Sequence, residues 1–375
     1  MKIALIEPRA SYFIAGSERV SLKHAEHLAD LGHEVVLYTS DVPSLRETFF
    51  FKELSLKRIE GLSIKKFDVS KRLPGIYDIK PDSKHIRWVA ESIAFSEVIR
   101  EDLSSSAPDI ILTYYMPDCL FKPQEIPNIV YILGTPSVEI PAYSSFMQFC
   151  DAAISISSIV QKNWKDILSN IKQSYKLPTG VDYPVPITQK ILPKAQFNLV
   201  FAGRLIERKG VMTLMESFPL ILSKRDDVHL WIVGDGELRD ELEKKASSLG
   251  VKDHITFTGL VSNPSDYFKM ADICLFPSHR GDGLMGTVLE AMAAGRPIIA
   301  TTDNGNEDVM VHMKSGFLVR PYDQAQIAEA ALKLLSDENL RHLLGKNAEM
   351  YIEKNISWKK HAVNLAKIFE KVIRA

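Results

Sequence analysis

The chain alternates short apolar runs with longer amphipathic stretches over most of its 375 residues. The apolar run KIALIE (2–7) is followed by a helical pattern over 17–31, and the next apolar run is HEVVLYT (33–39). Strands that alternate with helices form βαβ units, which build a parallel sheet covered by helices on both faces. The alternation therefore predicts an α/β protein with Rossmann-like sheets.

The alternation is interrupted once and then resumes. Residues 178–195 contain four prolines and no helical period, which is typical of a linker. The first series occupies 1–177 and the second 196–355, and a further amphipathic helix fills 356–375. We therefore expect two doubly wound domains. Their ligands should bind at the carboxyl ends of the strands, in the cleft between the domains.

Composition excludes some classes of function. The formal net charge is −1, which gives no reason to expect a nucleic-acid partner. Cys119, Cys150 and Cys274 follow no metal-ligand spacing, so we expect them to be buried and reduced, as in a cytoplasmic protein. No apolar run approaches the roughly 18 residues of a membrane span, and MKIALIEP is too short for a signal peptide.

The segment GRLIERKG (203–210) sets Arg204 and Lys209 between two glycines, at the expected end of a strand. Arginine can fork onto phosphate oxygens and lysine adds a point charge, so a diphosphate would suit this loop. The alternative is an exposed loop that happens to be charged.

The segment GDGLMGTVLEAMAAG (281–295) carries Asp282 and Glu290 eight positions apart. If all of these residues were helical, the rise would be about 12 Å. This exceeds the roughly 5–9.5 Å between the two carboxylates of a glycosidase. We expect both to accept hydrogen bonds from hydroxyls of one long ligand, with phosphate at the helix N-terminus near Met285 to Val288. The alternative is a solvent-exposed Asp282 and a Glu290 on a helix face, although a carboxylate among apolar residues needs a partner.

Two other glycine segments are less specific. In IAGSERV (14–20), Gly16 at a helix start could let the backbone approach a ligand, or Ser17 could simply cap the helix. VGDGELRDELE (233–243) is similar to a dinucleotide fingerprint, but Arg239 occupies the position of the third glycine. A dehydrogenase is therefore disfavoured.

Together these segments resemble the retaining GT-B glycosyltransferases of the GT4 family, also called glycosyl transferases group 1. The resemblance covers nearly the whole chain and is most specific from about 196 to 320. The last helix, with Trp358, resembles the family's return helix, which packs on the first domain. The resemblance implies a hexosyltransferase-like enzyme of polysaccharide biosynthesis. Its donor would be a UDP- or GDP-type nucleotide sugar, and its acceptor a hydroxyl of a glycan, lipid or secondary metabolite, without a metal or other cofactor.

The resemblance also assigns roles to residues. Arg204 and Lys209 would hold the diphosphate, Asp282 would reach the transferred sugar, and Glu290 would reach the ribose. These four are the catalytic candidates, and the Gly16 loop would approach from the opposite domain. The remaining donor-binding candidates are Gly203, Val261 beside the base, Gly283, Leu284, Met285, Gly286, Thr287 and Val288.

The sequence departs from the family at three places. Ala15-Gly16 replaces the usual pair of glycines, and Asp282 replaces a glutamate. Leu133 and Gly134 stand where the family commonly has His-Gly, which leaves Thr135 or Tyr131 to position the acceptor hydroxyl. A sugar-nucleotide epimerase of the same architecture and a non-catalytic sugar-nucleotide-binding subunit therefore remain as alternatives.

Residues 45–90 are basic, with eleven Lys or Arg against six Asp or Glu, and include Phe49, Phe50 and Phe51. This region could touch an anionic membrane that carries a lipid-linked acceptor, at the inner face of the membrane. The alternative is a solvated surface over three core phenylalanines.

Overall fold

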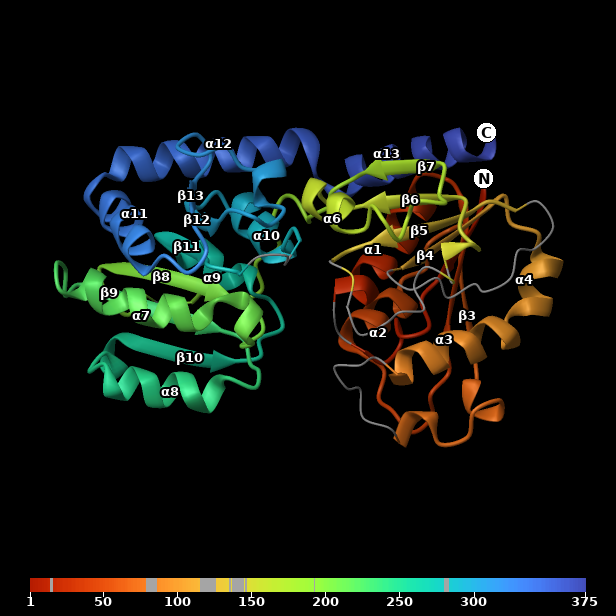
Figure 1. The fold of residues 1–375 in the computed structure, drawn as a ribbon, viewed down its shortest axis with the longest axis horizontal. Helices are drawn as coiled ribbons and strands as arrows, with labels where there is room; N and C mark the ends of the chain where they lie inside the picture. Colours follow the sequence, from red (N-terminus) through yellow and green to blue (C-terminus); the bar gives the residue numbers. More distant parts are fainter. Residues whose placement is uncertain are drawn as a thin grey trace. The chain divides into compact units, whose positions relative to one another are not determined.

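The computed structural model contains two compact units, each with a parallel sheet of its own (Figure 1). The first unit is Met1–Thr179 with Trp358–Ala375, and the second is Gly180–Ser357. The predicted α/β class with two Rossmann-like sheets is confirmed. The structure describes residues 1–13, 16–78, 86–114, 126–134, 136, 145, 147–191, 193–279 and 283–375.

The sheet of the first unit has the strand order β3-β2-β1-β4-β5-β6-β7 in the described residues, and each pair is parallel. Strands β4, β5 and β6 are buried at every position, because helices cover both faces. The strands are β1 Lys2–Ile6, β2 Glu34–Ser40, β3 Leu62–Phe67, β4 Ile110–Tyr114, β5 Asn128–Ile132, β6 Ala152–Ser155 and β7 Gln173–Lys176.

The helices of the first unit contact the sheet with apolar side chains. Phe95 and Leu103, from α3 and α4, pack with Ile6 and Tyr38 in one core cluster. Helix α1 packs against α2 and against the C-terminal helix α13. The helices are α1 Gly16–Asp30, α2 Phe49–Leu56, α3 Ile86–Val98, α4 Arg100–Ser106, α6 Ser158–Asn163 and α13 Trp358–Ile373, and two short 3₁₀ turns are η1 Val69–Lys71 and η2 Ile76–Asp78.

A chain of buried hydrogen bonds holds α13 against α1. His361 Nδ1 lies 2.8 Å from the carbonyl oxygen of Pro178, and His361 Nε2 lies 2.7 Å from His24 Nε2. A carbonyl oxygen can only accept, so His361 carries its proton on Nδ1 and His24 donates from Nε2. The hydroxyl of Tyr114, 2.9 Å from His24 Nδ1, then donates to that nitrogen. Burial lowers the pKa of both imidazoles, to about 4 for His361, so both rings are neutral at pH 7.

The sheet of the second unit has the order β10-β9-β8-β11-β12-β13 in the described residues, again with parallel pairs. Strands β8 and β11, which are far apart in sequence, lie next to each other in it. Their carboxyl ends therefore open onto the same edge of the sheet. The strands are β8 Phe197–Ala202, β9 Val228–Val233, β10 Ile255–Gly259, β11 Ile273–Phe276, β12 Ile298–Thr301 and β13 Phe317–Val319.

Helix α7 contacts both α8 and α11, and α10 contacts both α9 and α12. One core cluster joins Phe197, Leu199 and Phe201 of β8 to Phe218 of α7 and Leu334 of α11. The helices are α7 Val211–Leu222, α8 Arg239–Ser248, α9 Ser265–Met270, α10 Gly286–Ala293, α11 Gln324–Ser336 and α12 Glu338–Asn355, and the 3₁₀ turns are η3 Glu207–Lys209, η4 Lys252–His254 and η5 Asn306–Asp308.

The proline-rich segment expected to be a linker begins at the boundary between the units. Val181 forms an isolated parallel bridge with Ser357, and its N–H donates to the carbonyl oxygen of Ile356 at 3.0 Å. Among its described residues, 182–196 contain no helix or strand. Cys150 and Cys274 are buried, as predicted, whereas Cys119 lies outside the described residues.

Candidate functional site

The loop after β8 carries the two predicted phosphate-binding cations. Arg204 is exposed, and Lys209 is half-buried at the end of the turn η3. Gly210 then begins α7 with φ 66°, in the left-handed region that favours glycine. Because Gly210 is the N-cap residue and has no side chain, it leaves the first N–H groups of α7 without a side-chain cap from that position.

Glycines after β9 support the loop after β8. A Cβ at Gly234 would lie 2.0 Å from the carbonyl oxygen of Gly203, and one at Gly236 would lie 2.5 Å from that of Leu205. The N–H of Gly203 donates to Val233 at 3.0 Å, so the two loops are joined through their backbones. The glycines of VGDGELRDELE therefore allow close backbone approach between two loops, a role that the sequence analysis missed.

The loop after β11 leads into α10 and contains most of the remaining predicted residues. Leu284 and Met285 are buried, and Met285 accepts a hydrogen bond from Ser278 Oγ through its sulfur at 2.8 Å. The N–H of Gly305 donates to the carbonyl oxygen of Gly283 at 2.9 Å. The segments that follow β11 and β12 therefore both hold this loop in place.

Helix α10 begins at an exposed glycine. A Cβ at Gly286, its first residue, would meet no atom of the described residues within 4 Å, and Thr287 is half-buried. The N–H of Val288 donates within the turn to Met285 at 3.1 Å, and the Val288 side chain is buried. Glu290 is half-buried in the same helix. The helix thus offers an accessible N-terminus, and its N–H groups carry partial positive charge.

Two contacts bring the loops after β8 and β11 together. A Cβ at Gly210 would lie 1.8 Å from the carbonyl oxygen of Pro277, so only glycine allows this approach. The N–H of His279 donates to the carbonyl oxygen of Arg208 at 2.8 Å. The turn that carries Lys209 and the loop that leads into α10 therefore lie side by side at one edge of the sheet. Such an arrangement of cations and a helix N-terminus can bind an anion.

Other predicted residues are placed less specifically. Val261 is half-buried after β10, two strands away from β8, and Gly16 is the exposed first residue of α1 in the first unit. Asp282 and Thr135 lie outside the described residues. Tyr131 is fully buried, and its hydroxyl donates to the carbonyl oxygen of Leu177 at 2.8 Å. Tyr131 is therefore a core residue and not a substitute for the missing histidine.

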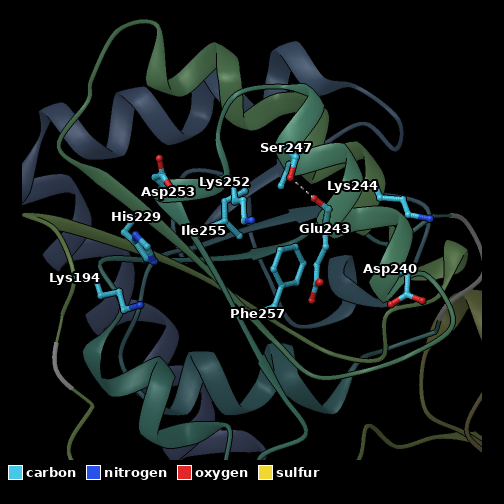
Figure 2. A pocket seen from close by; sticks show the side chains of 11 residues that line it. Lys194, His229, Asp240, Glu243, Lys244, Ser247, Lys252, Asp253, Ile255 and Phe257 are labelled. Atoms are coloured by element: carbon cyan, nitrogen blue, oxygen red, sulfur yellow. Dashed lines mark hydrogen bonds between the residues drawn. The ribbon is translucent and has the colours of Figure 1, made fainter.

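A groove of about 690 Å³ lies elsewhere on the second unit, along α8, β10 and the start of β9 (Figure 2). Its lining includes Lys194, His229, Glu243 and Phe257, and none of the predicted site residues. Burial and the charge of Lys194 lower the pKa of His229 to about 4. None of its lining residues belongs to the loops after β8 and β11, so the groove is separate from the candidate site.

Within the described residues, no group of three or more His, Cys, Asp or Glu side chains is arranged to hold a metal ion. None of the described helices has the length and apolarity that crossing a bilayer requires.

The comparisons with known proteins concern mainly the second unit. Residues 187–350 match the family described as Glycosyl transferases group 1. The second unit is therefore similar to the domains of that family over most of its length. The chain as a whole is 27% identical to spore coat protein SA of Bacillus subtilis over 370 residues, which cover 88% of this chain and 96% of that protein.

Two further matches extend the comparison. A GDP-mannose-dependent alpha-(1-6)-phosphatidylinositol monomannoside mannosyltransferase of Mycobacterium tuberculosis is 31% identical over 233 residues, which are 58% of this chain and 60% of that protein. The crystal structure of Anabaena Alr3699/HepE in complex with UDP is similar in fold, with a TM-score of 0.77 at 16% identity over 99% of this chain and 100% of that one. The fold is therefore GT-B.

Proposed function

We propose that the protein is a retaining hexosyltransferase that moves a sugar from a UDP- or GDP-type nucleotide sugar to an acceptor hydroxyl. The observation that carries this proposal is the approach of Gly210 to Pro277, which sets the turn of Lys209 beside the loop leading into α10. A diphosphate bound there would meet Arg204, Lys209 and the amides of Gly286 and Thr287. Gly203, Gly283, Leu284, Met285 and Val288 would form the surroundings of this anion.

The same groups account for catalysis without a metal. Transfer places negative charge on the leaving diphosphate, and fixed cations with a helix N-terminus stabilise that charge as it develops. Removing one such contact typically costs about 2.7–4 kcal/mol of transition-state stabilisation. Arg204 and Lys209 would therefore act on the leaving group, and metal independence is part of the proposal.

The carboxylates bind the two ends of the donor. Glu290, in the second turn of α10, would accept hydrogen bonds from the ribose, and Asp282 would accept them from the transferred sugar. We assign same-face transfer: the sugar's bond to the phosphate oxygen breaks, its bond to the acceptor oxygen forms, and the leaving phosphate takes the acceptor's proton. This stereochemistry follows the family resemblance of the motifs.

Binding measurements test the diphosphate site first. Thermal-shift screening against UDP, GDP, ADP and dTDP identifies the base, because stabilisation increases with affinity. Arg204→Ala or Lys209→Ala should then weaken binding of that nucleoside diphosphate about a hundredfold, with little change for the nucleoside. Equal losses for both ligands would contradict the phosphate role.

The ribose contact has its own test. Glu290→Gln should weaken a ribonucleotide more than its 2′,3′-dideoxy analogue, because the carboxylate accepts from hydroxyls that the analogue lacks. An unchanged preference would remove Glu290 from the site.

Turnover decides between transfer and other outcomes. Incubation with a nucleotide sugar and a pool of glycan, lipid and small-molecule acceptors should release free nucleoside diphosphate together with a glycosylated product. A new isomer of the sugar nucleotide, or binding with no turnover, would contradict the transferase.

We also propose that α2 touches an anionic membrane that carries the acceptor. Of its three phenylalanines only Phe51 is in the core, whereas Phe49 is 62% exposed and Leu56 is 83% exposed. Lys52 and Arg58 are exposed nearby. Exposed apolar side chains flanked by cations are typical of helices that lie in a membrane interface.

Several lysines of this region form ion pairs within the protein, so they are less available to lipid phosphates than the exposed apolar side chains are to the lipid tails. Lys57 pairs with Glu26 at 2.7 Å, Lys65 pairs with Asp102 at 2.6 Å, and Lys66 pairs with Glu47. We therefore expect contact with lipid to depend on Phe49 and Leu56 more than on the number of basic residues.

Flotation with vesicles tests the membrane contact. The protein should float with vesicles that contain phosphatidylglycerol and less with phosphatidylcholine alone, and Phe49→Ser with Leu56→Ser should reduce flotation. Leu343→Ser, at a 55% exposed leucine of α12, is the matched control. No binding to anionic vesicles, or equal loss in the control, would remove the membrane contact.

A further inference from the structure

His279 follows β11 and immediately precedes residues 280–282, and the sequence analysis did not single it out. Its side chain is buried, with 9% exposure. Its N–H is the donor to the carbonyl oxygen of Arg208 at 2.8 Å, which ties it to the turn of Lys209. The residue therefore stands where the two loops of the candidate site meet.

The imidazole of His279 contacts two more elements of the second unit. Its Nε2 lies 3.4 Å from the hydroxyl oxygen of Thr213, in the first turn of α7. Its ring stacks on Tyr322, which precedes α11, with centroids 3.8 Å apart and planes at 28°. Gly210 leaves room for the ring, since a Cβ there would lie 3.3 Å from His279 Cδ2. One ring thus bridges α7, the loop after β11 and the segment after β13.

Tyr322, whose ring stacks on His279, has a strained backbone conformation. Its φ of 63° lies in the left-handed region, which residues other than glycine, asparagine and aspartate rarely adopt. The side chain is 58% exposed, so burial of the tyrosine ring does not explain the strain. Strained residues persist where the surrounding structure enforces them, and they cluster at functional sites.

We propose that His279 is a positioning residue for the donor diphosphate, and this inference rests on the function proposed above. Its ring holds the first turn of α7 and the loop leading into α10 at one separation. The cation of Lys209 and the amides at the start of α10 then meet the same diphosphate. His279 contacts no reacting atom in this assignment and acts through the two loops. Small displacements of such groups weaken binding strongly, because the ligand needs all of them at once.

Calorimetric titration with UDP or GDP, whichever stabilises the protein more, and with the matching nucleoside tests the inference. His279→Ala should raise the Kd of the diphosphate about tenfold and leave that of the nucleoside within about twofold. His279→Phe, which keeps a ring for the stack, should recover part of the loss. Thr213→Val removes the hydroxyl at nearly constant shape and should raise the diphosphate Kd about threefold. His342→Ala, at an exposed histidine of α12, is the control.

The outcomes separate this inference from the proposed function. If Arg204→Ala weakens the diphosphate selectively and His279→Ala does not, only the positioning role is wrong. If neither variant is selective, the diphosphate site itself is wrong. A purely structural role for His279 would weaken both ligands equally, and this result would also overturn the inference. If His279→Ala does not fold, Thr213→Val decides, and an unchanged diphosphate Kd in that variant rejects the positioning role.

Discussion

The first strand of each sheet is followed by a loop, and the two loops are held in place by different means. After β1, buried charged side chains join Glu7 and Arg9 to Glu18 at the start of α1. After β8, backbone atoms hold residues 203–210, because glycines leave room for close approach. The conformation of the first loop therefore depends on ion pairs between buried side chains. The conformation of the second loop depends on glycines that have no Cβ at the points of close approach.

The charged network of the first unit reaches across several elements. Arg9 donates to Glu7 at 3.0 Å and lies 3.9 Å from Glu18, and all three side chains are buried. From α3, the fully buried Glu91 accepts a hydrogen bond from the hydroxyl of Tyr12 at 2.6 Å. Burial and the charge of Glu91 raise the pKa of Tyr12. Buried carboxylates tolerate such a site only when donors surround them.

The glycine contacts of the second unit are different in kind. Gly210 approaches Pro277, and Gly234 approaches Gly203, through main-chain atoms alone. Such contacts carry no net charge and no titratable group. Main-chain contacts can therefore help to fix a loop at the carboxyl end of a strand, provided that a glycine leaves room for the close approach. Three substitutions and one change of pH test this comparison.

The largest effect is expected at Gly234. Gly234→Ala places a Cβ 2.0 Å from the carbonyl oxygen of Gly203 at φ 131°, and backbone cannot move as easily as a side chain. We expect a loss of about 3 kcal/mol or more in the free energy of unfolding of the second unit, measured by urea denaturation. Gly250→Ala, at φ 69° with no atom within 4 Å, is the control for backbone strain alone. It should cost about 1 kcal/mol. Equal losses would mean that the close approach is unimportant.

The next effect is expected at Glu91. Glu91→Ala removes a buried carboxylate that accepts from the hydroxyls of Tyr12 and Ser40, and leaves these donors without their acceptor. We expect the first unit to lose about 3 kcal/mol, measured by urea denaturation. Glu97→Ala, at an exposed glutamate of the same helix, should change the stability by less than about 0.5 kcal/mol. A loss at Glu91 as small as that at Glu97 would contradict the role of buried charge.

Lowering the pH should change the stability of the first unit by a comparable amount. Burial lowers the pKa of His24 and of His361 below the ordinary value of 6.5, so between pH 6.5 and about 4 the unfolded chain binds more protons than the folded one. The stability of the first unit should therefore fall as the pH is lowered from 7 to 5. The slope should approach about 1.4 kcal/mol per pH unit for each proton taken up.

Urea denaturation of the wild type and of His361→Gln at pH 7, 6 and 5 measures this effect. The variant lacks one titrating imidazole and should show a shallower dependence on pH, from a lower stability at pH 7. Parallel curves for the two proteins would show that the buried histidine pair does not cause the loss.

The smallest effect is expected at Tyr12. Tyr12→Phe deletes one hydrogen bond to Glu91, whose carboxylate still accepts from Ser40 at 3.2 Å. We expect a loss of about 1 kcal/mol in the stability of the first unit by urea denaturation. A loss as large as that of Glu91→Ala would show that the tyrosine, and not the carboxylate, organises the network.

Most strands could be predicted because central strands of a parallel sheet are continuous apolar runs. The strands that were not predicted, β3, β7 and β13, all lie at sheet edges. β3 and β7 have no fully buried position, as in LSIKKF of β3 with its two lysines, so their apolar pattern is weak, and β13 has three residues. The spacing of Arg204 and Lys209 indicated the loop after β8 as a site, and its phosphate role stays a prediction, whereas His279 has no local signal in the sequence.

By itself, the sequence determined the α/β class, the two sheets and the glycine loops at the carboxyl ends of strands, because periodicity and glycine act over a few residues. Only the tertiary structure decided which partners meet: Tyr12 bonds to Glu91, 79 positions away, and His24 bonds to His361, 337 positions away. It also decided that Gly210 meets Pro277 and that His279 stacks on Tyr322. Such contacts depend on which strands become neighbours, and no short stretch of sequence contains that information.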